Sequence, residues 1–148
     1  MPSWKIKLYE TYVTTQQSAA SNQNIDEIQL SRFPQYRHII SNYLPPDKTT
    51  RIADLGCGYG QLLFCLKAMG YTNIDGVDAS SEQVKIAHQL GLKEVRQGDL
   101  TGFLNEVSGK YDVIFLMDVL EHMQKHEVIN ILELIGNTLS EQGQLVIH

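Results

Sequence analysis

The feature that most constrains this chain of 148 residues is a short apolar run that leads directly into three alternating glycines. The run Ile-Ala-Asp-Leu contains one carboxylate, Asp54, and the glycines follow as Gly56, Gly58 and Gly60, before an amphipathic stretch over residues 62–69. This order predicts a strand, a tight loop and a helix, because glycine adopts positive φ angles and lets the backbone approach a ligand. Such a loop delivers a ligand to a helix N-terminus, where nucleotide-type cofactors bind in open α/β sheets.

Strand and helix patterns alternate along the chain after residue 50. Connections of helix length between successive strands imply a parallel sheet with helices on both faces. We therefore expect an α/β fold, a Rossmann-like doubly wound sheet with strand order 3-2-1-4-5, which places the glycine loop where the strand order reverses. The expected strands are 52–55, 73–77, 94–97, 111–117 and 143–147, and the expected helices are 62–69, 80–90, 100–107 and 128–139.

Residues 1–49 are predicted to form an N-terminal helical arm, and residues 50–148 the binding core. Pro34 predicts a break between two helical pieces of this arm, because proline cannot donate the hydrogen bond that a helix interior needs. Tyr9 and Tyr12 either close over a bound ligand as a lid or pack on the outer helices.

Composition restricts the class of protein. The net charge is −5, the sequence pI is about 5.4 and no basic tract is present, so we expect no nucleic-acid partner. No apolar run approaches the roughly 20 residues of a membrane-spanning helix, and the first residues lack the apolar core of a signal peptide, so we expect no membrane partner. The two cysteines, Cys57 and Cys65, form no disulfide framework, and we interpret them as reduced thiols in a cytoplasmic protein.

Several interpretations of the glycine loop and the acids downstream remain open from the residues alone. A dinucleotide site has the spacing G-x-G-x-x-G, but Gly58 and Gly60 leave the last interval one residue short, and a turn without a ligand is a further alternative. Asp78 ends the second expected strand and either accepts hydrogen bonds from a ribose diol or stabilises the dipole of the next helix. Asp99 follows the third expected strand and is typical of a turn or a helix N-cap.

Two segments resemble a known family. Residues 54–60, Asp-Leu-Gly-Cys-Gly-Tyr-Gly, resemble at every fixed position the D-x-G-x-G-x-G loop of class I S-adenosylmethionine (SAM) methyltransferases. Residues 118–122, Asp-Val-Leu-Glu-His, look like the segment that follows the fourth strand in that family. The likeness is closest to small-molecule enzymes of the ubiquinone-biosynthesis O-methyltransferase type. It covers roughly residues 50–148, and the motifs arrive in the family's order.

This resemblance implies SAM as the cofactor, S-adenosylhomocysteine (SAH) as the product, and in-line transfer of a methyl group to O or N of a small-molecule acceptor. It implies that Asp99 binds adenine, and it offers His122 as a base for a hydroxyl acceptor, although a structural histidine at a helix start fits equally well. The residues that it implies around the cofactor are Asp54, Gly56, Cys57, Gly58, Gly60, Asp78, Ala79, Asp99, Leu100 and Asp118.

A metal site and two alternative functions also have to be weighed. Related ubiquinone-pathway enzymes hold a divalent ion with an acid-x-x-Glu-His pattern, and the matching side chains here are those of Asp118, Glu121 and His122. These residues are weak candidates for metal ligands, and we expect no metal. The alternatives to an enzyme are a non-catalytic SAM-binding or assembly module and an NAD-dependent oxidoreductase domain. Asp54 and the short glycine spacing argue against the oxidoreductase.

The sheet of this family usually has seven strands, whereas this sequence ends within the fifth. We therefore expect that strands 6 and 7 are lacking and that the chain is the N-terminal part of a longer protein or a fragment cut at a domain boundary. An uncovered strand at residues 144–147 is a pairing hazard, so we expect the missing C-terminal region or a second copy of the chain to cover it.

Overall fold

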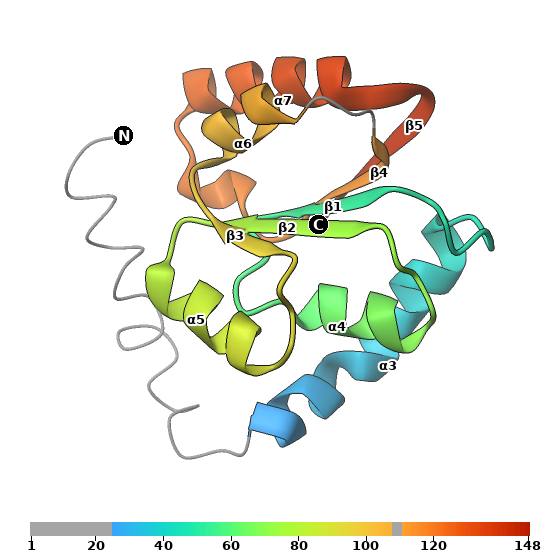
Figure 1. Ribbon diagram of the computed structural model, residues 1–148. Coiled ribbons are helices and arrows are strands. Elements are labelled where there is room, and N and C mark those ends of the chain that lie inside the picture. Colours follow the sequence, from blue (N-terminus) through green and yellow to red (C-terminus); the bar gives the residue numbers. More distant parts are fainter. Residues whose placement is uncertain (1–24, 108–110) are drawn as a thin grey trace.

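The computed structural model describes residues 25–107 and 111–148, so the predicted lid residues Tyr9 and Tyr12 lie outside the described part. Helices and strands alternate as the sequence indicates (Figure 1). The elements are α3 (Ile25–Tyr43), β1 (Ile52–Leu55), α4 (Gln61–Ala68), β2 (Ile74–Asp78), α5 (Ser81–Gln89), β3 (Val95–Gln97), α6 (Leu100–Glu106), β4 (Tyr111–Leu116), the 3-10 turn η2 (Leu120–His122), α7 (Lys125–Thr138) and β5 (Leu139–Ile147).

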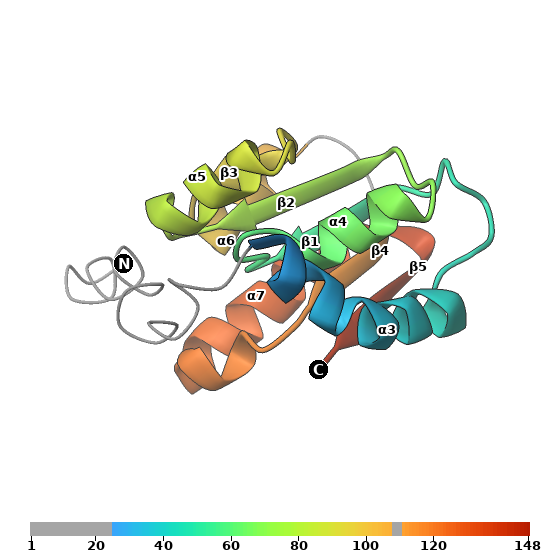
Figure 2. The same ribbon diagram turned by 90° about the horizontal axis from the view of Figure 1, so that it is seen from below.

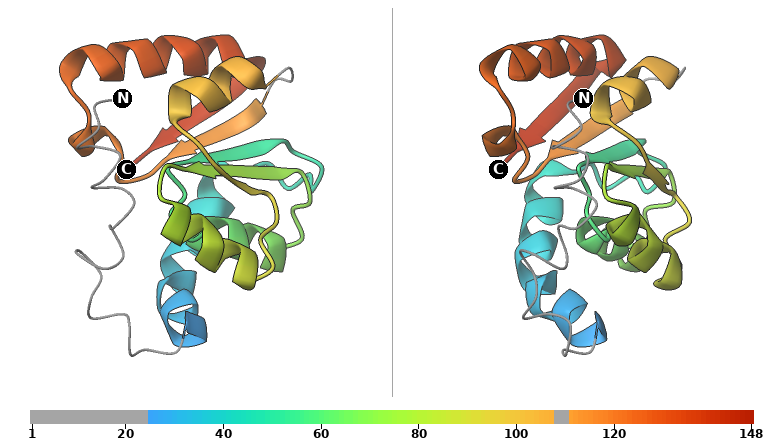
Figure 3. Two further views of the ribbon diagram at one scale, coloured as in Figure 1. Left: turned by 60° about the vertical axis from the view of Figure 1, so that its left-hand side comes forward. Right: turned by 90° about the vertical axis from the view of Figure 1, so that its left-hand side faces the viewer.

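The sheet has five parallel strands in the order β3-β2-β1-β4-β5, which confirms the predicted α/β architecture. Helices α6 and α7 cover one face, and α3, α4 and α5 cover the other (Figures 1 and 2). Side views show the sheet between these two helical layers (Figure 3). The order reverses between β1 and β4, so the loop after β1 lies at the switch point.

Alternate residues of the central strands supply two separate cores. Ile52 and Phe115 pack beneath α3, α4 and α5, whereas Ala53 and Ile114 belong to the core beneath α6 and α7. All four side chains are fully buried. This alternation is the two-residue period of a strand, and burial of both faces explains why β1 and β4 are almost continuously apolar.

The predicted break at Pro34 is wrong, because Pro34 lies inside the single helix α3. Phe33, Tyr36 and Ile40 pack against the core beneath α4 and lie on one helical stripe that passes Pro34. The apolar residues before and after the proline follow the same helical period, so the stripe is continuous. The packing thus offsets the missing backbone hydrogen bond, which costs about 3 kcal/mol in an unpacked helix.

Strand β5 begins four residues earlier than predicted. Leu139 already pairs with Tyr111, and an irregularity then separates this pair from the regular register that starts at Gln144 opposite Val113. A Cβ at Gly143 would come within 2.9 Å of the Ser140 nitrogen, so glycine permits the tight path of the chain there. Within the described ranges, no helix has the length and apolar character to cross a membrane.

Candidate functional site

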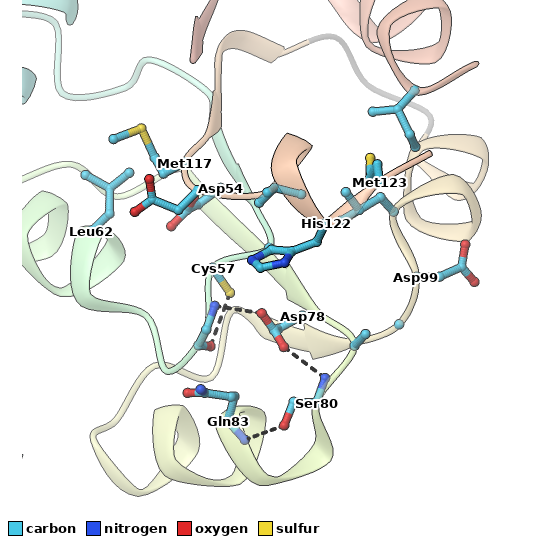
Figure 4. Close-up of a pocket in the computed structure, with 18 of the residues that line it drawn as sticks. Asp54, Cys57, Leu62, Asp78, Ser80, Gln83, Asp99, Met117, His122 and Met123 are labelled. Atoms are coloured by element: carbon cyan, nitrogen blue, oxygen red, sulfur yellow. Dashed lines mark hydrogen bonds between the residues drawn. The ribbon is translucent and has the colours of Figure 1, made fainter. Parts of the chain in front are cut away.

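A cavity of about 440 Å³ opens at the carboxyl ends of the strands, where the glycine loop meets the segments that follow β2, β3 and β4 (Figure 4). The volume lies within the range of small-molecule and cofactor sites. Four aspartates line it, one from the carboxyl end of each of four successive strands. They are Asp54 on β1, Asp78 on β2, Asp99 after β3 and Asp118 after β4.

The glycine loop is held by its own backbone amides. The N–H groups of Gly56 and Cys57 donate to the Val77 carbonyl, and that of Gly60 donates to the Cys57 carbonyl. The Gly58 N–H donates to the Asp78 carboxylate at 2.8 Å. These four amides are therefore already used within the protein.

Close packing explains why two of the loop positions require glycine. A Cβ at Gly56 would lie 2.6 Å from a methyl group of Val119, and Gly56 has φ 76°. A Cβ at Gly60 would overlap Leu92, and Gly60 has φ 85°. Gly60 is the one predicted cofactor residue that does not line the cavity, and its absent side chain serves the packing of the loop on the core.

Asp78 joins the glycine loop to the start of α5. One carboxylate oxygen accepts the Gly58 N–H, and the other accepts the Ser80 N–H at 2.8 Å. Burial raises the pKa of Asp78, and the two backbone hydrogen bonds oppose this shift. Ser80 in turn caps α5 by accepting the N–H of Gln83.

Asp54 is the most buried acid of the site, with only 3% of its surface exposed. Burial, together with the neighbouring charge of Asp78, raises the pKa of Asp54 to about 7. The carboxyl group faces the cavity between Leu62 and Met117 (Figure 4). It therefore changes charge near neutral pH, and a cation in the cavity would favour its ionised form.

Asp99 caps helix α6, because one of its oxygens accepts the Gly102 N–H at 2.9 Å. Both Asp99 and Leu100 line the cavity, as does Ala79 after β2. The N-cap interpretation of Asp99 is therefore correct as local structure. Its second oxygen keeps its capacity to accept a hydrogen bond from a ligand.

The segment after β4 brings Asp118 and His122 to the cavity. Asp118 adopts a left-handed backbone conformation, with φ 54°, and its carboxylate contacts Nδ1 of His148 at 2.8 Å. Glu121 does not line the cavity, and its carboxylate lies 4.0 Å from Nε2 of His122. No group of three metal-ligating side chains occurs in the described ranges, so Asp118, Glu121 and His122 are not assembled as a metal centre there.

Several cavity residues were not predicted from the sequence. Arg32 and Tyr36 reach the cavity from α3, and Tyr59 reaches it from the glycine loop. Burial raises the pKa of Tyr36, which the Arg32 side chain opposes, and burial raises that of Tyr59 to about 12. Tyr59 could have been found from its place inside the glycine motif, but Arg32 carries no motif. Gln83 also lines the cavity, although the sequence indicates only that it lies within the expected helix 80–90.

Comparisons with known proteins agree with this geometry. The profile of the family described as "Methyltransferase domain" matches residues 28–148. The ubiquinone biosynthesis O-methyltransferase of Bordetella avium (strain 197N) is 32% identical over 78 residues, which cover 49% of this chain and 32% of that enzyme. The match thus spans about a third of the length of this curated relative.

Solved structures share the fold over almost the whole chain. Magnesium protoporphyrin IX methyltransferase (ChlM) from Synechocystis PCC 6803 with bound SAH is 18% identical, with a TM-score of 0.71 over 98% of this chain and 70% of that chain. The plantazolicin methyltransferase BpumL in complex with SAH is 25% identical, with a TM-score of 0.70 over 97% of this chain and 57% of that chain.

Proposed function

Because this chain belongs to the methyltransferase domain family and has the fold of class I SAM-dependent methyltransferases, we propose that it binds SAM in the cavity and transfers the methyl group to a small molecule. The observation that carries this proposal is the row of four aspartates, one from each of four adjacent strand ends. An accumulation of carboxylates in one half-buried cavity favours a cationic ligand.

The charges of the cavity complement those of SAM, which carries a sulfonium, an ammonium and a carboxylate. Arg32 is the only lysine or arginine among the described residues that line the cavity. We assign the ligand carboxylate to the Arg32 guanidinium, which can hold it with two parallel hydrogen bonds. We assign the ammonium and sulfonium to the side of the cavity that Asp54 and Asp118 supply.

The state of the glycine loop argues against a dinucleotide. A pyrophosphate requires free backbone N–H groups, but the amides of Gly56, Cys57, Gly58 and Gly60 all donate within the protein. A dinucleotide would also bring two phosphates among the four aspartates, where like charges repel. Both features support an adenosyl cofactor without phosphates.

We assign the adenosine half of the cofactor to the ends of β2 and β3. Each oxygen of Asp78 accepts one backbone N–H and keeps a lone pair for a ribose hydroxyl. The free oxygen of Asp99 is available to the adenine amino group, and Ala79 and Leu100 provide apolar contacts for the ring.

When bound, SAM supplies an electrophilic methyl group on its sulfonium. The work of the chain is to hold the acceptor in line with the methyl–sulfur bond and to exclude water from the reacting atoms. His122 lines the cavity from η2, and we assign to it the removal of a proton from a hydroxyl acceptor. An amine acceptor that binds in its neutral form needs orientation alone.

The organisation of the chain follows from this assignment. We propose that residues 50–148 form the SAM-binding core, and that the N-terminal arm contributes to the cofactor site through α3, which brings Arg32 and Tyr36 to the cavity. The free thiols Cys57 and Cys65 support a reducing compartment such as the cytoplasm.

Isothermal titration with SAM, SAH and NAD tests the cofactor. Binding of SAM and SAH that is lost in Asp78→Ala but kept in Asp75→Ala would support the proposal, because Asp75 lies outside the cavity on the same strand. Binding of NAD alone would refute it. Transfer of labelled methyl from SAM to a panel of phenols, catechols and amines then distinguishes an enzyme from a SAM-binding module without turnover.

A further inference from the structure

Tyr36 is a cavity residue to which the proposed reaction gives no role. It belongs to α3, where Phe33, Tyr36 and Ile40 form one helical stripe that packs against the core beneath α4. Within this stripe Ile40 is fully buried, whereas Tyr36 is half-buried and lines the cavity. The apolar ring of Tyr36 therefore packs where the core meets the cavity, and its exposed surface there is accessible to a ligand.

The charges around Tyr36 indicate where its hydroxyl group lies. Burial is the main cause of its raised pKa, the charges of Asp54 and Asp118 raise the pKa further, and Arg32 opposes the shift. Because charges act strongly only over short distances, the hydroxyl lies near the carboxyl ends of β1 and β4, which carry the two aspartates. The raised pKa also keeps the phenol neutral at physiological pH.

This place in the cavity is the one to which we assign the sulfonium of SAM, since Asp54 and Asp118 supply the negative charge there. A neutral phenol adds no charge, but its oxygen has lone pairs that accept hydrogen bonds. The C–H groups of a methyl sulfonium are polarised by the positive charge and donate weak hydrogen bonds to oxygen. SAH has a neutral thioether and no such methyl group, so a phenol oxygen here fits SAM better than SAH.

We propose that Tyr36 is a catalytic residue whose hydroxyl oxygen contacts the methyl sulfonium of bound SAM, so that the site distinguishes the cofactor from its product. This inference rests on the proposed function, and it adds to it a residue that no motif identifies. The contact restrains the methyl group in line with the acceptor. It is lost once the methyl group has left, which favours the release of SAH.

Two other roles of the hydroxyl lead to different expectations. If it orients Arg32, to which we assign the ligand carboxylate, its removal weakens SAM and SAH equally, because both ligands carry that carboxylate. If it serves only the packing of α3 on the core, its removal changes the stability of the free chain and neither affinity. The ratio of the two Kd values therefore separates a contact to the sulfonium from both alternatives.

Calorimetric titration of the full chain with SAM and with SAH tests the assignment. The titrations are made at pH 8, where most of Asp54 is ionised because its pKa is about 7. The variant is Tyr36→Phe, which keeps the ring and removes only the hydroxyl. The matched control is Tyr43→Phe, at an exposed tyrosine that ends the same helix outside the cavity.

We expect Tyr36→Phe to weaken the binding of SAM about two- to fivefold, the effect of one weak hydrogen bond, and to leave the Kd for SAH unchanged. The ratio of the Kd for SAH to that for SAM should fall by the same factor. Tyr43→Phe should keep both affinities. Without ligand, Tyr36→Phe should melt close to the wild type, because the ring that packs on the core is retained.

Equal weakening of SAM and SAH in Tyr36→Phe would overturn the inference, since the hydroxyl would then act through the shared part of the ligands. Unchanged affinities for both ligands would overturn it as well. In either case the wild type still binds SAM and SAH, so the proposed cofactor stands. Failure of the wild type to bind SAM and SAH would overturn the proposed function together with the inference.

Discussion

The buried carboxyl of Asp54 couples folding and cofactor binding to pH. Its folded-state pKa of about 7 lies above the ordinary value of 3.8, so the folded chain binds more protons than the unfolded chain between these two values. Stability is therefore highest at the acid end of this window and falls as the pH rises through it. The folded and unfolded pKa values of Asp54 differ by about three, which corresponds to a loss of at most about 4 kcal/mol in unfolding free energy.

Replacement of Asp54 by asparagine removes this titration and keeps the shape of the side chain. The Asp54→Asn variant is expected to exceed the wild type in unfolding free energy at pH 8 by up to about 4 kcal/mol, and to lose more than half of this advantage by pH 5. Urea unfolding at three pH values measures the difference. A variant that is less stable than the wild type at pH 8 would contradict the reasoning.

The same ionisation controls the affinity for SAM, because the positive ligand favours charged Asp54. With a pKa near 7, the ionised fraction rises from about one tenth at pH 6 to about nine tenths at pH 8, so the affinity should rise about tenfold. Calorimetry at pH 6 in two buffers of different ionisation enthalpy should detect the release of nearly one proton on binding.

The control must separate Asp54 from the other groups of the cavity. A pH slope with any other origin persists in Asp54→Asn, whereas the slope that Asp54 causes disappears. Asp99→Asn, at an exposed acid of the same cavity, should keep the wild-type slope. An unchanged slope in Asp54→Asn would refute the role of Asp54.

Three further predictions concern other residues of the site. Gly60→Ala should lower the unfolding free energy in urea by about 2–4 kcal/mol, because its Cβ would overlap Leu92 at a positive φ. As a control, the Cβ of Gly136→Ala in α7 would meet no neighbour, and this variant should gain about 0.5–1 kcal/mol. His122→Asn should lower kcat for hydroxyl acceptors about 100-fold and leave the Kd for SAM unchanged, and equal effects on both would contradict its role as base. Arg32→Met should weaken SAM about tenfold but leave 5′-methylthioadenosine, which has no carboxylate, unaffected, and equal weakening of both ligands would place the carboxylate elsewhere.

The sequence predicted those parts of the fold that local patterns determine. The alternation of apolar runs and helical stripes was sufficient for the strand order, and the resemblance to class I methyltransferases is confirmed by the family match. Pro34 was misjudged because a local rule was applied to a helix whose apolar stripe packs on the core on both sides of the proline. The early start of β5 depends on the close approach of Gly143 to the backbone of another strand, which no local pattern records.

The site was predictable to the extent that its residues belong to the strand ends. Parallel strands bring their carboxyl ends to one edge, so the aspartates after successive strands were expected to converge there, and they line the cavity. Arg32 and Gln83 were missed because helix packing, not a motif, brings them to the cavity. Gly60 was assigned to the cofactor because motif spacing cannot distinguish a glycine that faces a ligand from one that faces the core.

Two largely buried carboxyl groups lie beside the glycine loop, where they are unfavourable in the free protein. Burial raises the pKa values of Asp54 and Asp78, and the charge of Asp78 raises that of Asp54 further. A cation in the cavity favours the ionised form of Asp54, so a cationic ligand restores stability that the free chain lacks. The sulfonium of SAM supplies such a charge. It follows that SAM should stabilise the wild type more than SAH does, and that the difference should shrink in Asp54→Asn. The comparison is made at pH 8 with equal free concentrations of SAM and SAH. Concentrations scaled to each Kd would give equal shifts of the melting temperature by mass action alone and would hide the difference in affinity. Equal stabilisation of the wild type by the two ligands under those conditions would show that the sulfonium charge contributes nothing to the fit.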